Sequence, residues 1–222
     1  MPLPSVSLPY LVRQPLSIEP GRKPPLLVLL HGLGSNEADL MGLADQIDPR
    51  YLIVSIRAPI VLGSYGFGWY SITGLLGNLK HNEVEAEAGR LAAEKAIEEL
   101  TAAFDIDKER VFLMGFSQGA VMSLGITLIK PQLIAGAVIM SGALLPAFAD
   151  RVRADQSRRI PILVVHGRWD EVLPVDGARE IRDFLATQSV DLSYHEYPMG
   201  HEVSIESLDE VTIWLTSVLD AT

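Results

Sequence analysis

Apolar residues gather in short runs along the chain, and segments of mixed character separate those runs. The uninterrupted runs are typical of buried strands and occupy residues 26–30, 51–56, 111–114, 133–140 and 160–165. A further segment, residues 190–197, alternates between apolar and polar positions and predicts another strand. The intervening segments predict helices over residues 36–47, 83–104, 120–130, 175–188 and 203–219.

Strands and helices alternate in this way without a repeat or an internal linker. The order predicts a single α/β domain over residues 1–222, with a mainly parallel central sheet and helices on both faces. Ligands of such sheets bind at the C-terminal ends of the strands. Polar residues that directly follow the predicted strands are therefore the candidates for chemistry.

Two segments depart from this alternation. Residues 1–25 are rich in proline, and residues 7–13 within them alternate as an edge strand does. Residues 60–82 form a long connection with five glycines and several aromatic side chains. Connections of this length in compact domains are usually functional or disordered, and the aromatic anchors argue against disorder.

Hydrophobic residues make up 48% of the chain, and residues 111–129 and 131–149 carry no charge. Such stretches approach the length of a membrane-spanning helix. However, glycines flank Ser117 in the first, and Pro146 with two glycines interrupts the second. Strands of a parallel sheet that is covered on both faces produce the same apolar runs. No stable membrane insertion is therefore predicted.

The net charge and the absence of cysteine exclude further classes of function and of site. The net charge of −10 argues against binding to nucleic acid or to anionic membranes. The absence of cysteine excludes disulfides, thiolate catalysis and zinc–thiolate sites. The N-terminal residues lack a basic segment followed by an apolar run, so they do not resemble a secretory signal. We expect a cytoplasmic protein.

The segment Gly115-Phe116-Ser117-Gln118-Gly119 lies between the apolar run 111–114 and a predicted helix. A Gly-x-Ser-x-Gly sequence in this position is the pattern of a nucleophile elbow. The turn is so tight that the positions two before and two after the serine must lack bulk, which glycine provides. The elbow predicts Ser117 as a nucleophile above the sheet edge. The simpler alternative is a glycine-rich turn in which Ser117 caps the helix.

A serine nucleophile needs a base within hydrogen-bond reach. His201 is the best placed of five histidines, because it follows the strand 190–197 in a loop beside Gly200. A solvated loop histidine is the alternative interpretation. Of the remaining histidines, His31 and His166 follow predicted strands directly. His195 lies within a strand, and His81 lies in the long connection.

A third group must orient the base, and Asp170 follows the strand 160–165 at the same sheet edge. The resulting order Ser–Asp–His is the order of hydrolases with a nucleophile elbow. Asp176 competes for this role, but its position suggests an N-cap of the helix 175–188. Glu171 is a weaker competitor, and Asp170 also suits a turn before Pro174.

An oxyanion formed by attack of Ser117 needs hydrogen-bond donors in fixed positions. One predicted donor is the backbone N–H of Gln118, and the other is the backbone N–H of Leu33 in the loop after the first buried strand. Gly32 and Gly34 let that loop approach closely. The alternative is a plain strand-to-helix turn. A dinucleotide fingerprint does not fit, because the third glycine is absent.

With these residues in view, the chain resembles the phospholipase/carboxylesterase family of α/β-hydrolases, which includes acyl-protein thioesterases. Six blocks in family order span residues 26 to about 215, and they carry the resemblance: Leu30-His31-Gly32-Leu33-Gly34-Ser35, Arg57-Ala58-Pro59, Gly66-Phe67-Gly68-Trp69-Tyr70, Gly115-Phe116-Ser117-Gln118-Gly119-Ala120, His166-Gly167-Arg168-Trp169-Asp170-Glu171-Val172-Leu173-Pro174 and Tyr197-Pro198-Met199-Gly200-His201. The resemblance implies an α/β-hydrolase fold. It also implies hydrolysis of carboxylic esters or thioesters through Ser117, Asp170 and His201, without a cofactor.

The resemblance further implies that the loop around residues 62–80 covers an acyl pocket. Family members often carry an aspartate after the Trp-Tyr pair, whereas this chain has Ser71 followed by a more apolar segment. We predict that Trp69, Leu75 and Leu76 line an acyl groove. The alternative is that these side chains only anchor the loop on the core.

Several functions stay open. The expected substrate is a small-molecule or lipid-like ester, which makes the protein a carboxylesterase. An acyl-protein thioesterase or a lysophospholipase, and a peptidase of the same architecture, are the enzymatic alternatives. A catalytically silent ligand-binding protein is the non-enzymatic one, and the complete triad argues against it. The exposed part of the aromatic loop fits either a homodimer surface or a lid that faces lipid. A metal hydrolase is disfavoured, because no histidine pair has helical ligand spacing.

Overall fold

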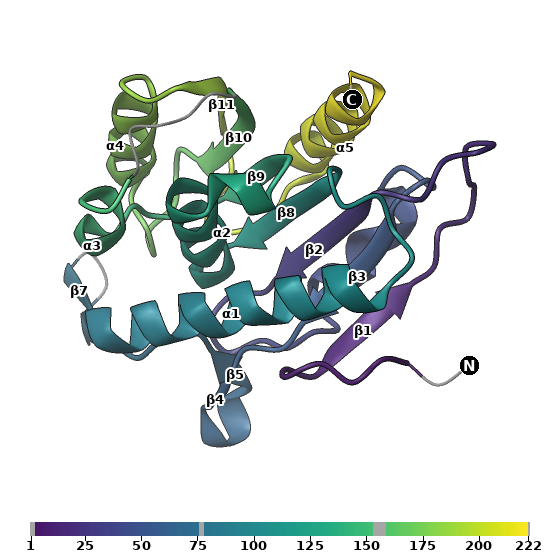
Figure 1. The fold of residues 1–222 in the computed structure, drawn as a ribbon. Helices are drawn as coiled ribbons and strands as arrows, with labels where there is room; N and C mark the ends of the chain where they lie inside the picture. Colours follow the sequence, from purple (N-terminus) through teal and green to yellow (C-terminus); the bar gives the residue numbers. More distant parts are fainter. Residues whose placement is uncertain (1–2, 76–77, 153–158, 222) are drawn as a thin grey trace.

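A computed structural model describes residues 3–75, 78–152 and 159–221. Seven strands form the central sheet in the order β1-β3-β2-β8-β9-β10-β11 (Figure 1). Their bounds are Tyr10–Arg13 for β1, Leu26–Leu30 for β2, Leu52–Ile56 for β3, Val111–Phe116 for β8, Gly136–Met140 for β9, Ile160–Gly167 for β10 and Val190–Tyr197 for β11. Only the edge strand β1 pairs antiparallel within this sheet, and the remaining pairs are parallel.

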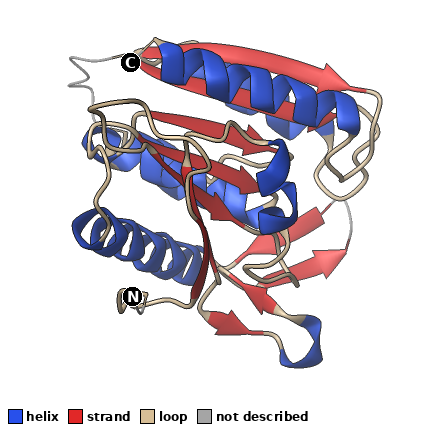
Figure 2. Ribbon diagram, turned by 90° about the vertical axis from the view of Figure 1, so that its right-hand side faces the viewer, coloured by secondary structure: helices blue, strands red, loops and turns tan. Residues whose placement is uncertain are grey.

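Helices cover both faces of this sheet (Figures 1 and 2). One face packs against α1 (Glu83–Ala103), α2 (Gln118–Ile129), α3 (Pro146–Ala149) and α4 (Val175–Leu185). The other face packs against the 3-10 helix η1 (Leu40–Gln46) and α5 (Ile205–Asp220). Side chains alternate between the two faces along each strand, so Val28 faces the first layer and Leu29 the second. This arrangement is an α/β-hydrolase fold, as the sequence predicts.

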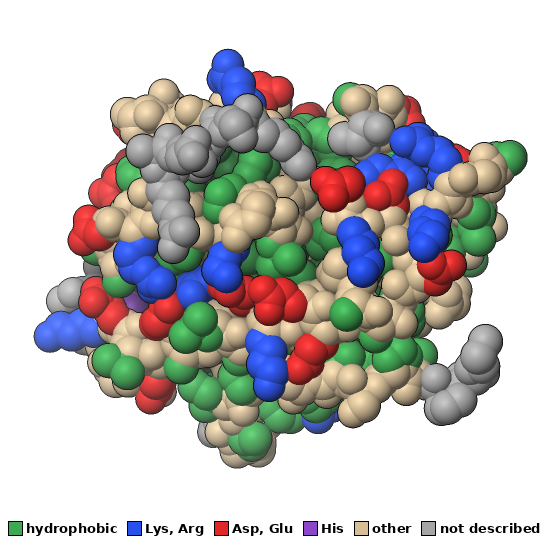
Figure 3. Space-filling view, viewed as in Figure 1, with side chains coloured by type: hydrophobic (Ala, Val, Ile, Leu, Met, Phe, Trp, Pro, Cys, Tyr) green, Lys and Arg blue, Asp and Glu red, His purple; other side chains and the backbone are tan. Residues whose placement is uncertain are grey.

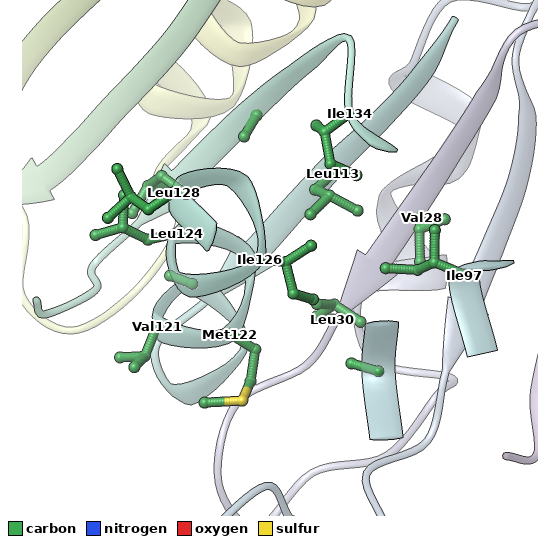
Figure 4. Packing of buried hydrophobic residues seen from close by; sticks show 14 of the residues in the cluster. Val28, Leu30, Ile97, Leu113, Val121, Met122, Leu124, Ile126, Leu128 and Ile134 are labelled. Atoms are coloured by element: carbon green, nitrogen blue, oxygen red, sulfur yellow. The ribbon is translucent and has the colours of Figure 1, made fainter. Parts of the chain in front are cut away.

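Helix α2 lies at the centre of the first layer, and all of its residues are buried. Its side chains meet apolar side chains of β2, β8 and α1, among them Leu30, Leu113 and Ile97 (Figure 4). Helices that are apolar on every side belong in a core or a membrane. Burial of β8 within the sheet and of α2 between the sheet and α1 therefore explains the uncharged stretch 111–129. Among the helices of the described residues, none is long and apolar enough to cross a bilayer.

Charged residues of both signs are interspersed over the face that α1 and α2 cover (Figure 3). Further charged side chains form ion pairs beneath this surface. Arg90 of α1 is 1% exposed and pairs with Glu87 and Glu94, and Glu94 also pairs with Lys130 at 3.0 Å. The pairs join α1 to the end of α2.

The predicted helix over residues 36–47 is wrong in extent and type. The carboxamide of Asn36 accepts a hydrogen bond from Ala38 N–H at 2.8 Å, and Ser35 Oγ donates to Asp39 at 2.6 Å. These local bonds hold the chain in a turn that competes with a helix. Only the 3-10 helix η1 follows, and it contains Gly42, a poor helix former.

The long connection over residues 60–82 contains two small antiparallel hairpins. Strands β4 (Ile60–Val61) and β5 (Phe67–Gly68) pair around the short 3-10 helix η2 (Gly63–Tyr65). This first hairpin projects from the body of the molecule in both ribbon views. Strands β6 (Ile72–Leu75) and β7 (Asn78–His81) form the second hairpin, which leads into α1. A remaining 3-10 turn, η3 (Pro131–Leu133), follows α2.

Candidate active site

Ser117 lies on the sharp turn between β8 and α2. Its backbone has φ 55° and ψ −119°, a conformation that L residues rarely adopt. A Cβ atom on Gly119 would lie 1.8 Å from the carbonyl oxygen of Leu30, and one on Gly115 would lie 2.3 Å from that of Gly119. Both glycines are therefore required sterically. Ser117 N–H donates to Met140 O at 3.0 Å, which ties the turn to the neighbouring strand β9.

His201 reaches Ser117 from the loop after β11. Its Nε2 lies 2.9 Å from Ser117 Oγ, and its Nδ1 lies 2.7 Å from Asp170 Oδ2. The ring of Phe116 packs beside the imidazole with a centroid separation of 5.0 Å. The order of contacts is that of a nucleophile, a base and an orienting carboxylate. Residues 84 positions apart in the sequence are thus brought into hydrogen-bond distance.

Asp170 is 5% exposed and hydrogen-bonded on both oxygens. Its Oδ1 accepts from Val172 N–H at 2.9 Å and from Leu173 N–H at 2.8 Å. Burial by itself raises the pKa of Asp170, but hydrogen bonds from His166, His201 and Leu173 outweigh it and hold the pKa below its ordinary value. The carboxylate is therefore charged at neutral pH and can stabilise an imidazolium.

His166 is a second histidine beside Asp170, and its side chain is fully buried at the end of β10. Its Nε2 lies 2.7 Å from Leu173 O and 3.4 Å from Asp170 Oδ2. Both neighbours are acceptors, so Nε2 carries the proton and donates to them. Among the described residues, Nδ1 of this ring has no hydrogen-bond partner.

The two predicted oxyanion donors lie at the turns after β2 and β8. The backbone N–H groups of Leu33 and Gln118 have no hydrogen-bond partner within the described part of the chain. A Cβ atom on Gly32 would lie 3.3 Å from Ser117 Cβ, so the two turns are in close contact. Gln118 is also the first residue of α2, where the helix dipole favours negative charge.

The side chain of Gln118 joins this turn to the connection over residues 60–82. Its Oε1 accepts from Trp69 N–H at 2.9 Å, and its Nε2 donates to Tyr70 O at 2.7 Å. Trp69 Nε1 donates to His31 O at 2.9 Å. The elbow, the loop after β2 and the hairpin segment are therefore connected by side-chain-to-backbone hydrogen bonds.

A cavity of about 270 Å³ opens beside Ser117 and His201. Its wall is largely apolar and consists of Leu33, Tyr70, Ile72, Leu79, His81, Val172 and Leu173, with Gln118 beside the two catalytic candidates. Four of these wall residues come from the second hairpin and the segment before it, namely Tyr70, Ile72, Leu79 and His81. A larger cavity, about 640 Å³, lies at the N-terminal ends of β10 and β11, near Pro161 and Asp191. Ser117, Asp170 and His201 are not among its lining residues.

A sequence model of the Phospholipase/Carboxylesterase family matches residues 16–219. The chain belongs to this family. Its match covers every strand from β2 to β11 and every residue of the arrangement around Ser117. The family consists of serine hydrolases of carboxylic esters and acyl thioesters.

Individual members of the phospholipase/carboxylesterase family align over most of the chain. An acyl-protein thioesterase 1 from Mycosarcoma maydis is 30% identical over 88% of this chain and 91% of its own length. The acyl-protein thioesterase 1 from Neurospora crassa is 29% identical over 89% and 93%. The crystal structure of esterase PE8 superimposes with a TM-score of 0.80 at 27% identity, covering 96% of this chain and 99% of that one.

The sequence predicts that Trp69, Leu75 and Leu76 line an acyl groove. The structure places the side chain of Trp69 in the core, fully buried, and not in the wall of the cavity. Of Leu75 the structure gives the backbone, in β6, and Leu76 lies outside the described residues. Six residues of the wall have no predicted site role: Tyr70, Ile72, Leu79, His81, Val172 and Leu173. Leu79 and His81 lie two positions apart in β7, so strand alternation directs both to one side of the second hairpin.

The structure gives Asp176 and His166 roles that differ from the sequence prediction. Asp176 is not the N-cap of α4, because Pro174 occupies that position and Asp176 lies in the first turn, paired with Arg179 at 3.0 Å. For His166 the sequence predicts only a position at the end of a strand. Its position four residues before Asp170, across a turn, is the signal that points to a contact with that carboxylate.

Proposed function

We propose that the protein is a carboxylesterase whose nucleophile is Ser117, whose general base is His201 and whose orienting carboxylate is Asp170. The observation that carries the proposal is the unbroken hydrogen-bonded chain from Ser117 Oγ through His201 to Asp170 beside an apolar cavity. Serine needs this arrangement to act as a nucleophile at neutral pH.

In the proposed reaction Ser117 Oγ attacks the ester carbonyl while His201 Nε2 accepts the hydroxyl proton. The tetrahedral oxyanion accepts hydrogen bonds from Leu33 N–H and Gln118 N–H. Collapse breaks the bond to the leaving alcohol, which takes the proton from His201. Water then attacks the acyl-enzyme with His201 again as base, and release of the carboxylic acid restores the Ser117 hydroxyl.

The proposed acyl site is the 270 Å³ cavity. This volume lies just below the range of about 300–1,000 Å³ that is typical of sites for drug-sized ligands. Its wall of aliphatic and aromatic side chains favours an apolar acyl group of short or medium length. The second hairpin, which supplies Ile72, Leu79 and His81, is the proposed cover of the site.

The direct test is the initial rate of hydrolysis of p-nitrophenyl esters from acetyl to palmitoyl, with Ser117→Ala as the blank. We expect hydrolysis that disappears in the variant and is fastest for short or medium chains. A folded wild-type protein with no Ser117-dependent hydrolysis of any ester would contradict the proposal and favour a silent binding protein or a peptidase.

An acyl-protein thioesterase is the second candidate, because two of the aligned relatives carry that name. The same chemistry serves both functions, so the leaving group and the chain length separate them. Matched acyl esters and acyl thioesters of each chain length, assayed side by side, make the distinction. A preference for long-chain thioesters would favour the second candidate over a short-chain carboxylesterase.

A further inference from the structure

The peptide group between Gly32 and Leu33 carries one of the two proposed oxyanion donors. In a trans peptide the C=O and N–H bonds point in opposite directions and are locked in one plane. A hydrogen bond that fixes the carbonyl oxygen of Gly32 therefore also fixes the direction of Leu33 N–H. Glycine offers no steric restraint of its own at this position.

The side chain of His31 holds that carbonyl. His31 Nδ1 lies 2.7 Å from Gly32 O, and the ring is fully buried. Its other nitrogen, Nε2, accepts a hydrogen bond from Ala58 N–H at 3.0 Å. A backbone N–H can only donate, so Nε2 carries no proton and Nδ1 is the donor to Gly32 O. Ala58 thus fixes the tautomer that the carbonyl requires.

Burial keeps His31 in this neutral form, because it lowers the pKa of the imidazole. The neighbouring backbone is restrained as well. Trp69 Nε1 donates to His31 O at 2.9 Å, and Gly34 N–H donates to Phe67 O at 2.8 Å. Ser35 N–H also reaches Gly32 O, at the longer distance of 3.3 Å. Gly32 O thus accepts two hydrogen bonds, and the one from His31 is the shorter.

We propose that His31 is a positioning residue for catalysis, which orients the Gly32–Leu33 peptide so that Leu33 N–H points at the oxyanion. The hydrogen bond on Gly32 O also polarises the peptide and strengthens its N–H as a donor. This inference rests on the proposed esterase function. It also gives a shared role to three of the family's sequence blocks, because Ala58 N–H binds the ring of His31 and the Trp69 indole binds its carbonyl oxygen.

The test compares His31→Leu with His31→Asn on a short-chain p-nitrophenyl ester. Leucine removes the donor to Gly32 O, whereas the asparagine carboxamide can place an N–H near the position of Nδ1. We expect His31→Leu to lower kcat by about 10²-fold, the effect of losing one oxyanion donor, with KM nearly unchanged. The kcat of His31→Asn should be about tenfold higher than that of His31→Leu.

The matched control is Tyr51→Phe, which removes another buried hydrogen bond from a side chain to a backbone carbonyl, 3.0 Å long, on the opposite face of the sheet. It should lower the free energy of unfolding without lowering kcat. A folded His31→Leu protein with wild-type kcat would overturn the proposal. Equal loss in the leucine and asparagine variants would overturn it too, because packing alone would then explain the effect.

A measurement on the wild-type protein keeps the inference testable if His31→Leu does not fold. ¹⁵N NMR of the histidine rings should show the His31 proton on Nδ1 at neutral pH. A proton on Nε2 would overturn the proposal, because Nδ1 would then have nothing to donate to Gly32 O. Failure of this inference leaves Ser117-dependent hydrolysis intact, whereas failure of the proposed function abolishes that hydrolysis in the wild-type protein itself.

Discussion

The two walls of the cavity beside Ser117 are built in different ways. Ser117 and Asp170 belong to turns that directly follow parallel strands, and His201 follows β11 after a short loop. The opposite wall comes from the loop after β2 and from residues 60–82, which lie outside the central sheet. On the first wall the main chain places Ser117, Asp170 and His201, the candidate catalytic residues. On the second, side chains such as Gln118 and His31 hold the main chain in place.

The difference predicts how each wall responds to substitution. Steric fit of the backbone governs the elbow, so a single added methyl group is enough to disrupt it. Hydrogen bonds govern the second wall, so removal of one side chain should loosen the wall without unfolding the sheet. Substitutions chosen on each wall therefore separate loss of fold, loss of chemistry and loss of positioning.

The largest effect is expected from Gly119→Ala. Its Cβ atom would lie 1.8 Å from Leu30 O, so the elbow and β2 must move apart. The free energy of unfolding should fall by about 4 kcal/mol or more, and activity should disappear. Gly177→Ala in α4 is the control, because a Cβ atom there meets nothing within 4 Å. It should raise the free energy of unfolding by about 0.5–1 kcal/mol, measured by urea denaturation.

Asp170→Asn should lower kcat by about 10⁴-fold with little change in fold, as loss of the orienting carboxylate does in other serine hydrolases. The carboxamide lacks the charge that stabilises protonated His201. Steady-state kinetics on the best p-nitrophenyl ester, with a circular dichroism spectrum of the variant, checks the expectation. A folded variant that keeps wild-type kcat would show that Asp170 has no catalytic role.

Gln118→Ala tests the second wall. It removes the bonds to Trp69 N–H and Tyr70 O and keeps the backbone N–H of residue 118. We expect kcat/KM to fall by about 10- to 10²-fold, because the displaced wall no longer fits the acyl group. The exposed Gln46→Ala serves as control and should match the wild type. Unchanged kinetics in Gln118→Ala would mean that the wall is held by other contacts.

The smallest expected effect is the pH dependence of the stability that Asp170 contributes. The pKa of Asp170 is lowered in the folded protein, so its contribution to stability is complete above about pH 4, the ordinary value of an aspartate, and is lost as pH falls through the folded pKa. The stability difference between wild type and Asp170→Asn should therefore shrink on acidification. Urea denaturation of both proteins at several pH values measures it. A difference that grows at low pH would contradict the lowered pKa.

The fold could be predicted from the sequence because its strands are continuous apolar runs. Residues 26–30 and 111–114 are such runs, and their burial on both faces leaves little choice of structure. The elbow could be predicted for a related reason. A Cβ atom on Gly115 would meet the backbone of Gly119 within the same turn, so the spacing of the two glycines is visible in the sequence, although the contact that requires Gly119 itself is with Leu30 of the neighbouring strand β2.

The second wall could not be predicted in this way, because its contacts are distant in sequence. The carboxamide of Gln118 bonds residues 69 and 70, which lie 49 and 48 positions away. Trp69 shows the consequence, since it suits a groove or a core equally well until its indole is seen to donate to His31 O. The two hairpins of residues 60–82 were likewise hidden, because glycines there obscure the alternation of short strands.

In the proposed mechanism His201 activates Ser117 as a nucleophile, and covalent labelling tests this activation without knowledge of the substrate. The protein would be treated with diethyl p-nitrophenyl phosphate and analysed by intact mass and peptide mapping, beside Ser117→Ala and His201→Ala. We expect one diethylphosphoryl group on Ser117 of the wild-type protein, with none on Ser117→Ala and far slower labelling of His201→Ala. A folded wild-type protein that stays unlabelled, or carries the label on another residue, would contradict it.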